Sequence, residues 1–467
     1  MENKKNHLQK ALTPIHLWGI AVGMVISGQY FGWNYGFEQG GTLGLAVAAI
    51  IITVFYTTFI FSYSELSTSI PHAGGPSAYA RRAMGPFMGF MTGLACLLEF
   101  VFAPPAIAVS TGAYIHFLIP SINAGYATVG MFIIFILINL IGVKGAAIIE
   151  LVATILALLG LTIYYASGLP HVDAANLFNK TAFHNGWSGV MAAIPFAIWF
   201  FLAIEGGAMA AEEVRNPKKD IPKGFISGIL TLAVATILTL FVTAGLGGGT
   251  GKPADYPLPQ ALADVYGKNS LFPISVAIIG LFGLIASLHG IIIGYSRQTF
   301  ALARAGYLPK FLSNLSRRGV PHWGLIVPGA IGVIAAGSAS FANGLIILSV
   351  FGAITMYCLS MLSLFMLRKK EPNLERPFKV SYPVVPLIAL ILGVFSFYCV
   401  VKYSVLTTVL PVFGVNLNLG TVILTIFGVA ILYYIFIGSK NLRPMSEEFV
   451  SIEDVTSNIE HGKNLNI

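Results

Sequence analysis

The segment that decides the fold runs from Ile194 to Gly207 and reads IPFAIWFFLAIEGG. It is apolar and aromatic, it is long enough to reach the middle of a bilayer, and there it carries the carboxylate of Glu205 beside two glycines. A charge at that depth costs several kcal/mol unless it lines a cavity or has a partner. Paired glycines favour a helix break, which frees backbone groups to meet a ligand. The segment therefore indicates a membrane helix that is broken where a small cation is carried.

The composition places the whole chain in a lipid bilayer. Of its 467 residues, 56% are hydrophobic and 10% are charged, and the mean hydropathy is +0.80. Soluble chains have about a quarter charged residues, so most of this surface must face lipid. Apolar runs of about 20 residues recur, each enough to cross a hydrocarbon core of ~30 Å. We predict twelve transmembrane helices, at 16–36, 42–64, 87–117, 125–143, 146–167, 188–211, 224–247, 272–299, 322–341, 344–367, 383–403 and 417–438.

The basic residues predict the orientation. With the N-terminus inside, all but four of the 27 lysines and arginines fall on the cytoplasmic side, the exceptions being Lys180, Lys252, Lys268 and Lys402. This asymmetry is the positive-inside rule. It predicts a multi-pass protein of the cytoplasmic (inner or plasma) membrane with both termini in the cytoplasm. Because the basic residues are divided among short loops and form no single stripe, we do not expect nucleic acid as a partner.

Two predicted spans contain glycine-rich interruptions at matching places. The first lies in span one, from Gly23 to Trp33, and the second is the segment in span six. Each interrupted span would be the first helix of a five-helix unit. Because five helices cross the membrane an odd number of times, the second unit would be inverted relative to the first. Such matched breaks are typical of the central site of a transporter, although membrane helices also carry glycine for close packing. We predict a cytoplasmic N-terminus at 1–15, a first five-helix repeat at 16–167, a second, inverted repeat at 188–367, two additional helices within 383–438, and a cytoplasmic tail at 439–467.

Three carboxylates lie at membrane depth. Glu99 is thirteen residues beyond Pro86, or ~20 Å of helix, and Glu205 is ten residues before Arg215, or ~15 Å from the same side. Glu150 is only ~9 Å from the cytoplasmic end of its span. Because they lie deeper in the membrane, Glu205 and Glu99 are stronger candidates for a functional role than Glu150. We expect one of the two deep carboxylates to bind an ammonium group and one to carry a proton; the alternative is a structural hydrogen bond to a neighbouring helix.

Protons are the favoured coupling ion. His289 lies well inside a late span and could relay protons, although a hydrogen-bonded structural histidine is an equal alternative. Sodium usually needs several hydroxyls and carbonyls, and this span offers Ser287 alone near the right depth. The proton-coupling candidates are therefore Glu205, Glu99 and His289, with sodium less favoured.

Aromatic side chains crowd both predicted breaks. Aromatic faces attract cations by ~2 kcal/mol when desolvated, and tryptophan does so best. The same side chains also serve as ordinary packing or as interfacial anchors. Trp199, one and a half turns before Glu205, is the strongest candidate, and the others are Tyr30, Phe31, Trp33, Tyr35, Phe200 and Phe201.

No motif indicates an enzyme, a cofactor or a metal site. The three cysteines, Cys96, Cys358 and Cys399, fall inside apolar spans and form no close-spaced metal set. The stretch from Gly245 to Pro253 resembles a phosphate loop, but Pro253 replaces the required serine or threonine. There is also no nucleophile elbow of a hydrolase.

Several segments together resemble the amino acid–polyamine–organocation superfamily, and within it the bacterial ethanolamine permeases. They are the loops IPHAGGP (Ile70–Pro76) and RNPKKDIP (Arg215–Pro222), ISGQYFGW (Ile26–Trp33), EFVFAPPA (Glu99–Ala106), Ile194–Gly206, Gly280–Pro309 and Ser349–Phe378. The resemblance implies a leucine-transporter-type fold, with two inverted five-helix repeats, two extra helices and alternating access around a central site. It also places Ile26, Ser27 and Gly28 in the unwound part of span one, and Trp199 through Glu205 in that of span six.

One residue departs from the pattern of the amino acid carriers. In those carriers a small residue usually follows the span-one Ser-Gly or its equivalent, so that backbone amides can hold a substrate carboxylate. Here Gln29 follows, and its side chain could instead bind a hydroxyl while Glu99 or Glu205 binds the ammonium. This arrangement fits a small amino alcohol.

These observations predict a secondary active transporter that imports ethanolamine, coupled to protons, with the substrate between spans one, three and six. The expected substrate-binding residues are Ile26, Ser27, Gly28, Gln29, Tyr30, Glu99, Trp199, Phe200, Phe201 and Glu205. The alternatives are a permease for a small neutral or cationic amino acid, an amine exchanger without proton coupling, and an amine-sensing receptor.

Overall fold

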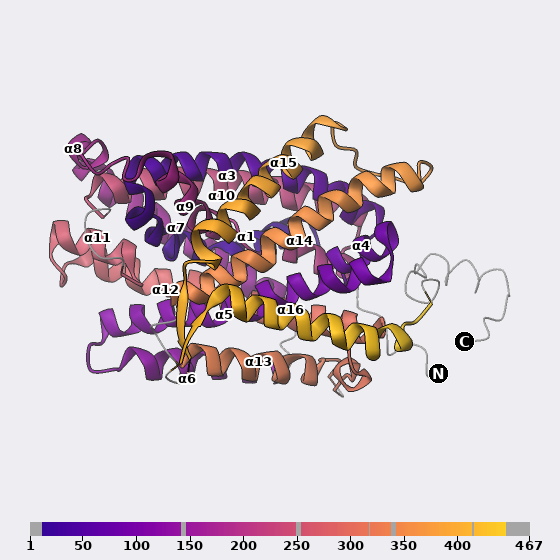
Figure 1. Ribbon diagram of the computed structural model, residues 1–467. Coiled ribbons are helices and arrows are strands. Elements are labelled where there is room, and N and C mark those ends of the chain that lie inside the picture. Colours follow the sequence, from indigo (N-terminus) through magenta and orange to yellow (C-terminus); the bar gives the residue numbers. More distant parts are fainter. Residues whose placement is uncertain are drawn as a thin grey trace.

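The computed structural model is a bundle of long helices aligned roughly along one direction (Figure 1). It describes residues 12–141, 146–248, 254–316, 318–337, 342–412 and 415–444. Within these residues, twelve helices exceed ten residues: α1 (Pro14–Val25), α3 (Gly36–Ser69), α5 (Pro86–Leu118), α6 (Ala124–Ile141), α7 (Ala146–Gly168), α9 (Gly186–Trp199), α10 (Pro217–Gly245), α12 (Leu271–Arg304), α13 (His322–Ala336), α14 (Ala342–Lys370), α15 (Val384–Val400) and α16 (Leu419–Phe436).

Each of these helices corresponds to one predicted span, so the prediction of an all-α polytopic membrane protein is confirmed. Ten spans are long and apolar enough to cross a membrane, and α1 and α13 are shorter apolar helices. The shorter elements are α2 (Ser27–Tyr30), η1 (Trp33–Tyr35), α4 (Pro76–Met84), η2 (Leu169–His171), α8 (Ala174–Leu177), η3 (Ile204–Glu213), α11 (Pro257–Tyr266), η4 (Lys310–Ser313), the π-helical η6 (Val401–Val405) and η7 (Gly438–Asn441).

A β-hairpin connects α15 to α16, which the sequence analysis did not predict. Strands β1 (Val409–Val412) and β2 (Val415–Asn418) are antiparallel, with Val409 opposite Asn418. They are the only strands in the part of the chain that the structure describes. Some predictions concern residues outside that part, namely residues 1–11 of the N-terminus, Lys144, residues 249–253 with Lys252, and the tail from residue 445.

The helices divide into an inner and an outer set. In their most apolar stretches, α5 and the α9–η3 span are 83% buried, whereas α6 and α16 are 17% buried. The outer helices expose apolar side chains, such as Ile134 of α6 and Leu424 of α16, as expected for surfaces that face lipid. The polar groups that could do chemistry therefore lie on the inner helices.

Span one is interrupted twice. Helix α1 ends at Val25, and Ile26 separates it from the single turn of α2. A larger break follows at Phe31, which is extended, and Gly32, which has φ 91°. The resemblance implied unwinding at Ile26, Ser27 and Gly28; in the structure Ser27 and Gly28 lie in α2, and the main break comes later.

Span six is also interrupted, but not at its glycine pair. Helix α9 ends at Trp199, and Ala203 adopts a left-handed conformation with φ 74° before η3 begins. A non-glycine residue in this region costs about 1–3 kcal/mol and is often found at functional sites. Gly206 and Gly207 lie within η3, where added Cβ atoms would stand 2.6 Å from Met24 and 2.6 Å from Phe225. The glycines therefore allow close packing, and the break precedes Glu205.

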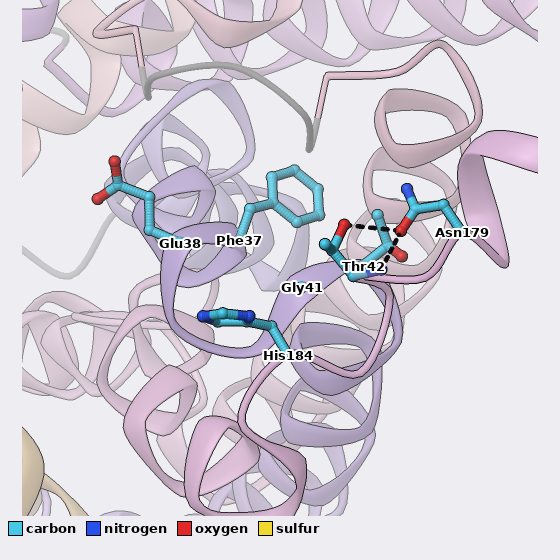
Figure 2. Close-up of a pocket in the computed structure, with 7 residues that line it drawn as sticks. Phe37, Glu38, Gly41, Thr42, Asn179 and His184 are labelled. Carbon is cyan, nitrogen blue, oxygen red and sulfur yellow. Dashed lines mark hydrogen bonds between the residues drawn. The ribbon is translucent and has the colours of Figure 1, made fainter.

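A kink at Gly41 separates the end of span one from span two within α3. Gly41 has φ 70°, and an added Cβ would stand 2.1 Å from the carbonyl oxygen of Thr181. Beside the kink lies a cavity of about 170 Å³, lined by residues of α3, including Glu38, and of the segment before α9, including Asn179 and His184 (Figure 2). This cavity lies at the end of the bundle predicted to face outward.

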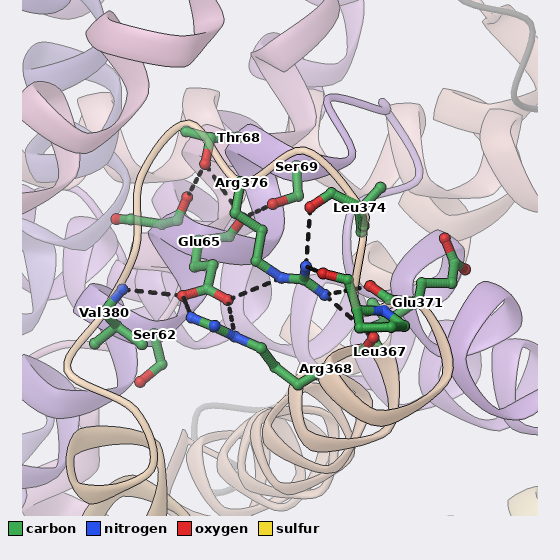
Figure 3. A network of polar contacts seen from close by, with 12 residues as sticks. Ser62, Glu65, Thr68, Ser69, Leu367, Arg368, Glu371, Leu374, Arg376 and Val380 are labelled. Carbon is green, nitrogen blue, oxygen red and sulfur yellow. Dashed lines mark hydrogen bonds and ion pairs between the residues drawn. The ribbon is translucent and has the colours of Figure 1, made fainter.

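A buried ion network holds α3 and α14 together at the opposite end (Figure 3). Arg368 of α14 donates two hydrogen bonds of 2.7 Å to the two oxygens of Glu65 in α3. Arg376 lies 3.4 Å from the same carboxylate, and the backbone N–H of Val380 donates to it at 2.9 Å. The Glu65 side chain is 2% exposed, so this carboxylate depends on its protein partners.

We expect Glu65→Ala to destabilise the protein by about 3–5 kcal/mol, because it leaves two guanidinium groups without their shared carboxylate. The measurement is the thermal unfolding midpoint of the purified protein in detergent. The matched control is Glu375→Ala, which removes an exposed ion pair with Lys218 and should leave the midpoint nearly unchanged. Equal midpoints for the two variants would contradict this role of Glu65.

Candidate functional site

Glu99 and Glu205, which the sequence places at similar depth, lie together in the interior. Glu99 lies in the middle of α5, Glu205 is the second residue of η3, and both side chains are fully buried. The Tyr357 hydroxyl of α14 donates to Oε2 of Glu205 at 2.8 Å and lies 3.4 Å from Oε1 of Glu99. The two carboxyl groups also interact directly with each other. Spans three, six and ten therefore converge on one acidic pair.

The other oxygen of each carboxyl group lacks a hydrogen-bond donor among the described residues. Oε2 of Glu99 and Oε1 of Glu205 are buried without a hydrogen bond from any described residue. A carboxylate left in this state costs several kcal/mol, and two together in lipid need a proton or a cation between them. The pair is therefore suited to receive a small positively charged group.

The break in span six places Glu205 opposite Glu99. The turn after α9 frees backbone groups, and the Ala203 backbone interacts with the Glu99 carboxyl group. The Phe200 carbonyl oxygen accepts a hydrogen bond of 3.2 Å from the Gln29 side chain. Because buried backbone groups need partners, these contacts stabilise the interrupted helix.

Aromatic rings surround the acidic pair. Tyr56 and Phe59 of α3 pack against Tyr357, with ring centroids at 5.4 and 4.5 Å. Phe201 stacks on Tyr56 at 5.1 Å, and the Tyr56 hydroxyl donates to that of Tyr357 at 3.3 Å. Of these residues, the sequence analysis identified only Phe201. Tyr357 lies within a segment that carries the family resemblance, which was the only signal for it.

Trp199 and Phe200 belong to a second aromatic layer at the break of span one. The Trp199 ring meets Phe31 edge-on at 5.5 Å, and Phe200 stacks on Trp33 at 5.2 Å. An added Cβ at Gly32 would stand 2.4 Å from the indole Nε1 of Trp199. This buried N–H has no hydrogen-bond partner among the described residues, so it is available as a donor.

Two other predicted site residues of span one, Gln29 and Tyr30, bind neighbouring helices and the break of span six. The Gln29 amide donates to Phe200 and Thr236, and Thr239 donates to its oxygen at 3.4 Å. The Tyr30 hydroxyl donates to the carbonyl of Ala157 at 2.6 Å. We expected Gln29 to bind a substrate hydroxyl, but in this conformation its side chain is occupied by protein groups.

Ser287 of α12 bridges the joint between α1 and α2. Its hydroxyl donates to the Gly23 carbonyl at 2.7 Å and accepts from the Ser27 N–H at 2.9 Å. Ile26, between them, is fully buried. An added Cβ at Gly28 would stand 2.3 Å from the Trp199 carbonyl oxygen, so the backbones of spans one and six cross in direct contact there.

Two other ionisable groups lie apart from the acidic pair. His289 contacts α6, where its Nδ1 is 3.1 Å from the Asn139 amide and its ring centroid is 6.0 Å from that of Phe135. Glu150 of α7 lies against glycines of α1 and α12, and its Oε1 has no partner among the described residues. The structure thus brings together two of the three predicted proton carriers, Glu99 and Glu205.

Polar contacts join neighbouring elements on both sides of the acidic pair. On one side, the loop after α10 lies over the break of span one: Tyr35 and Ser110 donate to Asp255, and Asn34 donates to Ala254. On the other side, Glu213 at the end of η3 forms an ion pair of 2.6 Å with Arg297 of α12.

Residues 16–443 match the amino acid permease family. The chain belongs to this family. Its relatives include an uncharacterized transporter of Rhizobium meliloti (27% identity; 84% of this chain and 86% of the relative), the methylthioribose transporter of Bacillus subtilis (25%; 83% and 88%) and a branched-chain amino acid permease of B. subtilis (26%; 75% and 80%). The protein is thus a multi-pass membrane transporter for amino-acid-like substrates, which confirms the resemblance at the level of the superfamily.

The loop that covers span one should dock more tightly as the pH falls. Burial raises the pKa of Asp255 from its ordinary value of 3.8, and the hydrogen bond from Tyr35 opposes this shift. A raised pKa in the docked state means that docking is most favourable below the ordinary pKa and weakens as the pH rises through the raised one. Hydrogen exchange in residues 254–266, corrected for intrinsic rates, should be slower at about pH 5 than at about pH 8.

Asp255→Asn is the control for this effect. It keeps the shape of the side chain and removes the titrating group, so the pH dependence of exchange in this loop should disappear. An unchanged dependence in this variant would assign the effect to another group.

Proposed function

We propose that the protein imports ethanolamine, or a closely related small cationic amine, by alternating access around the Glu99–Glu205 pair. The observation that supports this proposal is the burial of two interacting carboxyl groups, each with an unpartnered oxygen, at a helix break. An ammonium group supplies both positive charge and hydrogen-bond donors. The substrate is therefore expected to dock between spans one, three, six and ten.

The backbone of span one favours an amine that lacks a carboxylate. Its amides at Ser27, Gln29 and Phe31 already donate to Ser287, Ile26 and Ser27, respectively. In this conformation they are not free to hold an α-carboxylate, and the nearby acidic pair would repel one. The unpartnered indole N–H of Trp199 is a suitable donor to a substrate hydroxyl. These features together support an amino alcohol.

Charge balance supports protons as the coupling ion. Two carboxylates with one ammonium keep one negative charge, which a single proton would neutralise. With substrate and proton bound, the acidic pair would therefore carry no net charge while the transporter passes through its closed conformation. Ser287, the one hydroxyl predicted near a sodium site, is occupied by two backbone groups of span one. Glu99 and Glu205 are therefore the proposed proton carriers.

Two further proposals complete the transport cycle. We propose that 16–167 and 188–367 form inverted repeats, because each unit opens with a broken span, at Ile26–Gly32 and at Phe200–Ala203. We also propose that the end with the Glu65 network faces the cytoplasm of the cytoplasmic membrane, following the distribution of basic residues. The loop with Asp255 would then close the outward path.

A second candidate is the transport of a small neutral or cationic amino acid. It is favoured by the family itself and by the printed name of one relative, a branched-chain amino acid permease. Competition of labelled ethanolamine uptake by alanine, arginine and choline separates the two candidates. Stronger competition by alanine or arginine than by an equal concentration of unlabelled ethanolamine would favour the amino acid.

We expect Glu205→Gln and Glu99→Gln each to lower ethanolamine uptake into proteoliposomes by at least about 30-fold, because one variant removes the carboxylate that pairs with the buried ammonium and the other removes the group that carries the proton. The measurement uses purified protein with an imposed pH gradient. Glu375→Gln, at an exposed ion pair, is the control and should transport normally.

Three outcomes would contradict parts of this proposal. Normal uptake by Glu205→Gln would remove Glu205 from the site. Ethanolamine binding without accumulation or exchange would indicate a receptor. Accumulation that survives dissipation of the pH gradient would exclude proton symport and favour exchange.

A further inference from the structure

We infer that Tyr357 makes the site selective for primary ammonium groups over N-methylated ones. This inference rests on the proposed function, since it assumes that the acidic pair binds an amine. Tyr357 is fully buried in α14, and its hydroxyl is the one described side-chain group that contacts both Glu99 and Glu205.

The hydroxyl of Tyr357 is held in place from two directions. The Tyr56 hydroxyl donates to it at 3.3 Å, and the Phe59 ring packs against its ring at 4.5 Å between centroids. The hydroxyl donates its proton to Glu205 and accepts from Tyr56, and its second lone pair can accept from a ligand without movement of the oxygen. Its position between the two carboxyl groups is thus preorganised.

The site then offers three acceptors on three different residues. They are Oε2 of Glu99 and Oε1 of Glu205, both buried without a partner, and the Tyr357 hydroxyl oxygen. A primary ammonium carries three N–H donors, one for each acceptor. Each N-methyl group removes a donor and leaves a buried acceptor unpaired, which weakens binding by about tenfold or more.

The aromatic rings do not favour N-methylated amines over primary amines. Quaternary ammonium groups are recognised by the open faces of aromatic rings. Here a face of Tyr56 is covered by Phe201, with ring planes at 29°, and a face of Phe59 is covered by Tyr63, with ring planes at 26°. The oxygens, rather than ring faces, therefore determine which amine fits.

The test measures the affinity of purified protein for ethanolamine, N-methylethanolamine, N,N-dimethylethanolamine and choline, by competition against labelled ethanolamine and by thermal shift. We expect the affinity to fall by about tenfold or more with each methyl group. Equal affinities, or an order in which choline binds best, would overturn the inference while leaving amine binding intact. Failure of every amine to bind would overturn the proposed function as well.

Tyr357→Phe separates a selective role from a structural one, because it keeps the ring and removes the hydroxyl. We expect it to lower the affinity for ethanolamine by about tenfold or more and the affinity for N,N-dimethylethanolamine much less, so that the affinity ratio between the two amines becomes smaller. A purely structural role would weaken all four amines by the same factor, which would contradict the inference. The matched control is Tyr63→Phe, another buried tyrosine in contact with Phe59, which should keep the wild-type order. The methylation series on the wild-type protein decides the matter even if the variant does not fold.

Discussion

Two acidic side chains buried in contact with each other, within lipid, form the constraint on which the rest of the structure depends. Neither Glu99 nor Glu205 is exposed, and their common protein partner is one tyrosine hydroxyl. The interior cannot hold two unpaired negative charges, so the pair needs a bound proton or a bound cation. In the proposed transport cycle, each change of partner needs access from one side of the membrane.

Hydrogen bonds from side chains stabilise the broken helices around the acidic pair. Gln29 holds the freed carbonyl of Phe200, and Ser287 bridges the joint of span one. Among the described side chains near the breaks, the groups without a hydrogen-bond partner are two carboxyl oxygens of the acidic pair, the indole N–H of Trp199 and Oε1 of Glu150. The first three of these groups are those that an amine with a hydroxyl would meet in the proposed site, whereas the ion networks at Glu65 and Glu213 lie toward the ends of the helices.

The sequence could predict the parts of this arrangement that follow from periodicity and depth. Runs of apolar residues located the twelve helices, and counting 1.5 Å per residue placed Glu99 and Glu205 at matching depth. The position of the break in span six could not be predicted, because Ala203 adopts its left-handed conformation only through tertiary contacts. Tyr357 is one of 19 tyrosines and has no charge or pattern to distinguish it. The occupied side chain of Gln29 depends on partners about 200 residues away.

The most direct test of the central claim is an electron cryomicroscopy structure of the protein with ethanolamine, at a resolution that shows the ligand. The account predicts ligand density within hydrogen-bonding distance of both Glu99 and Glu205. Density elsewhere, for instance beside Glu150 or in the cavity at Glu38, with the acidic pair still closed around Tyr357, would contradict it.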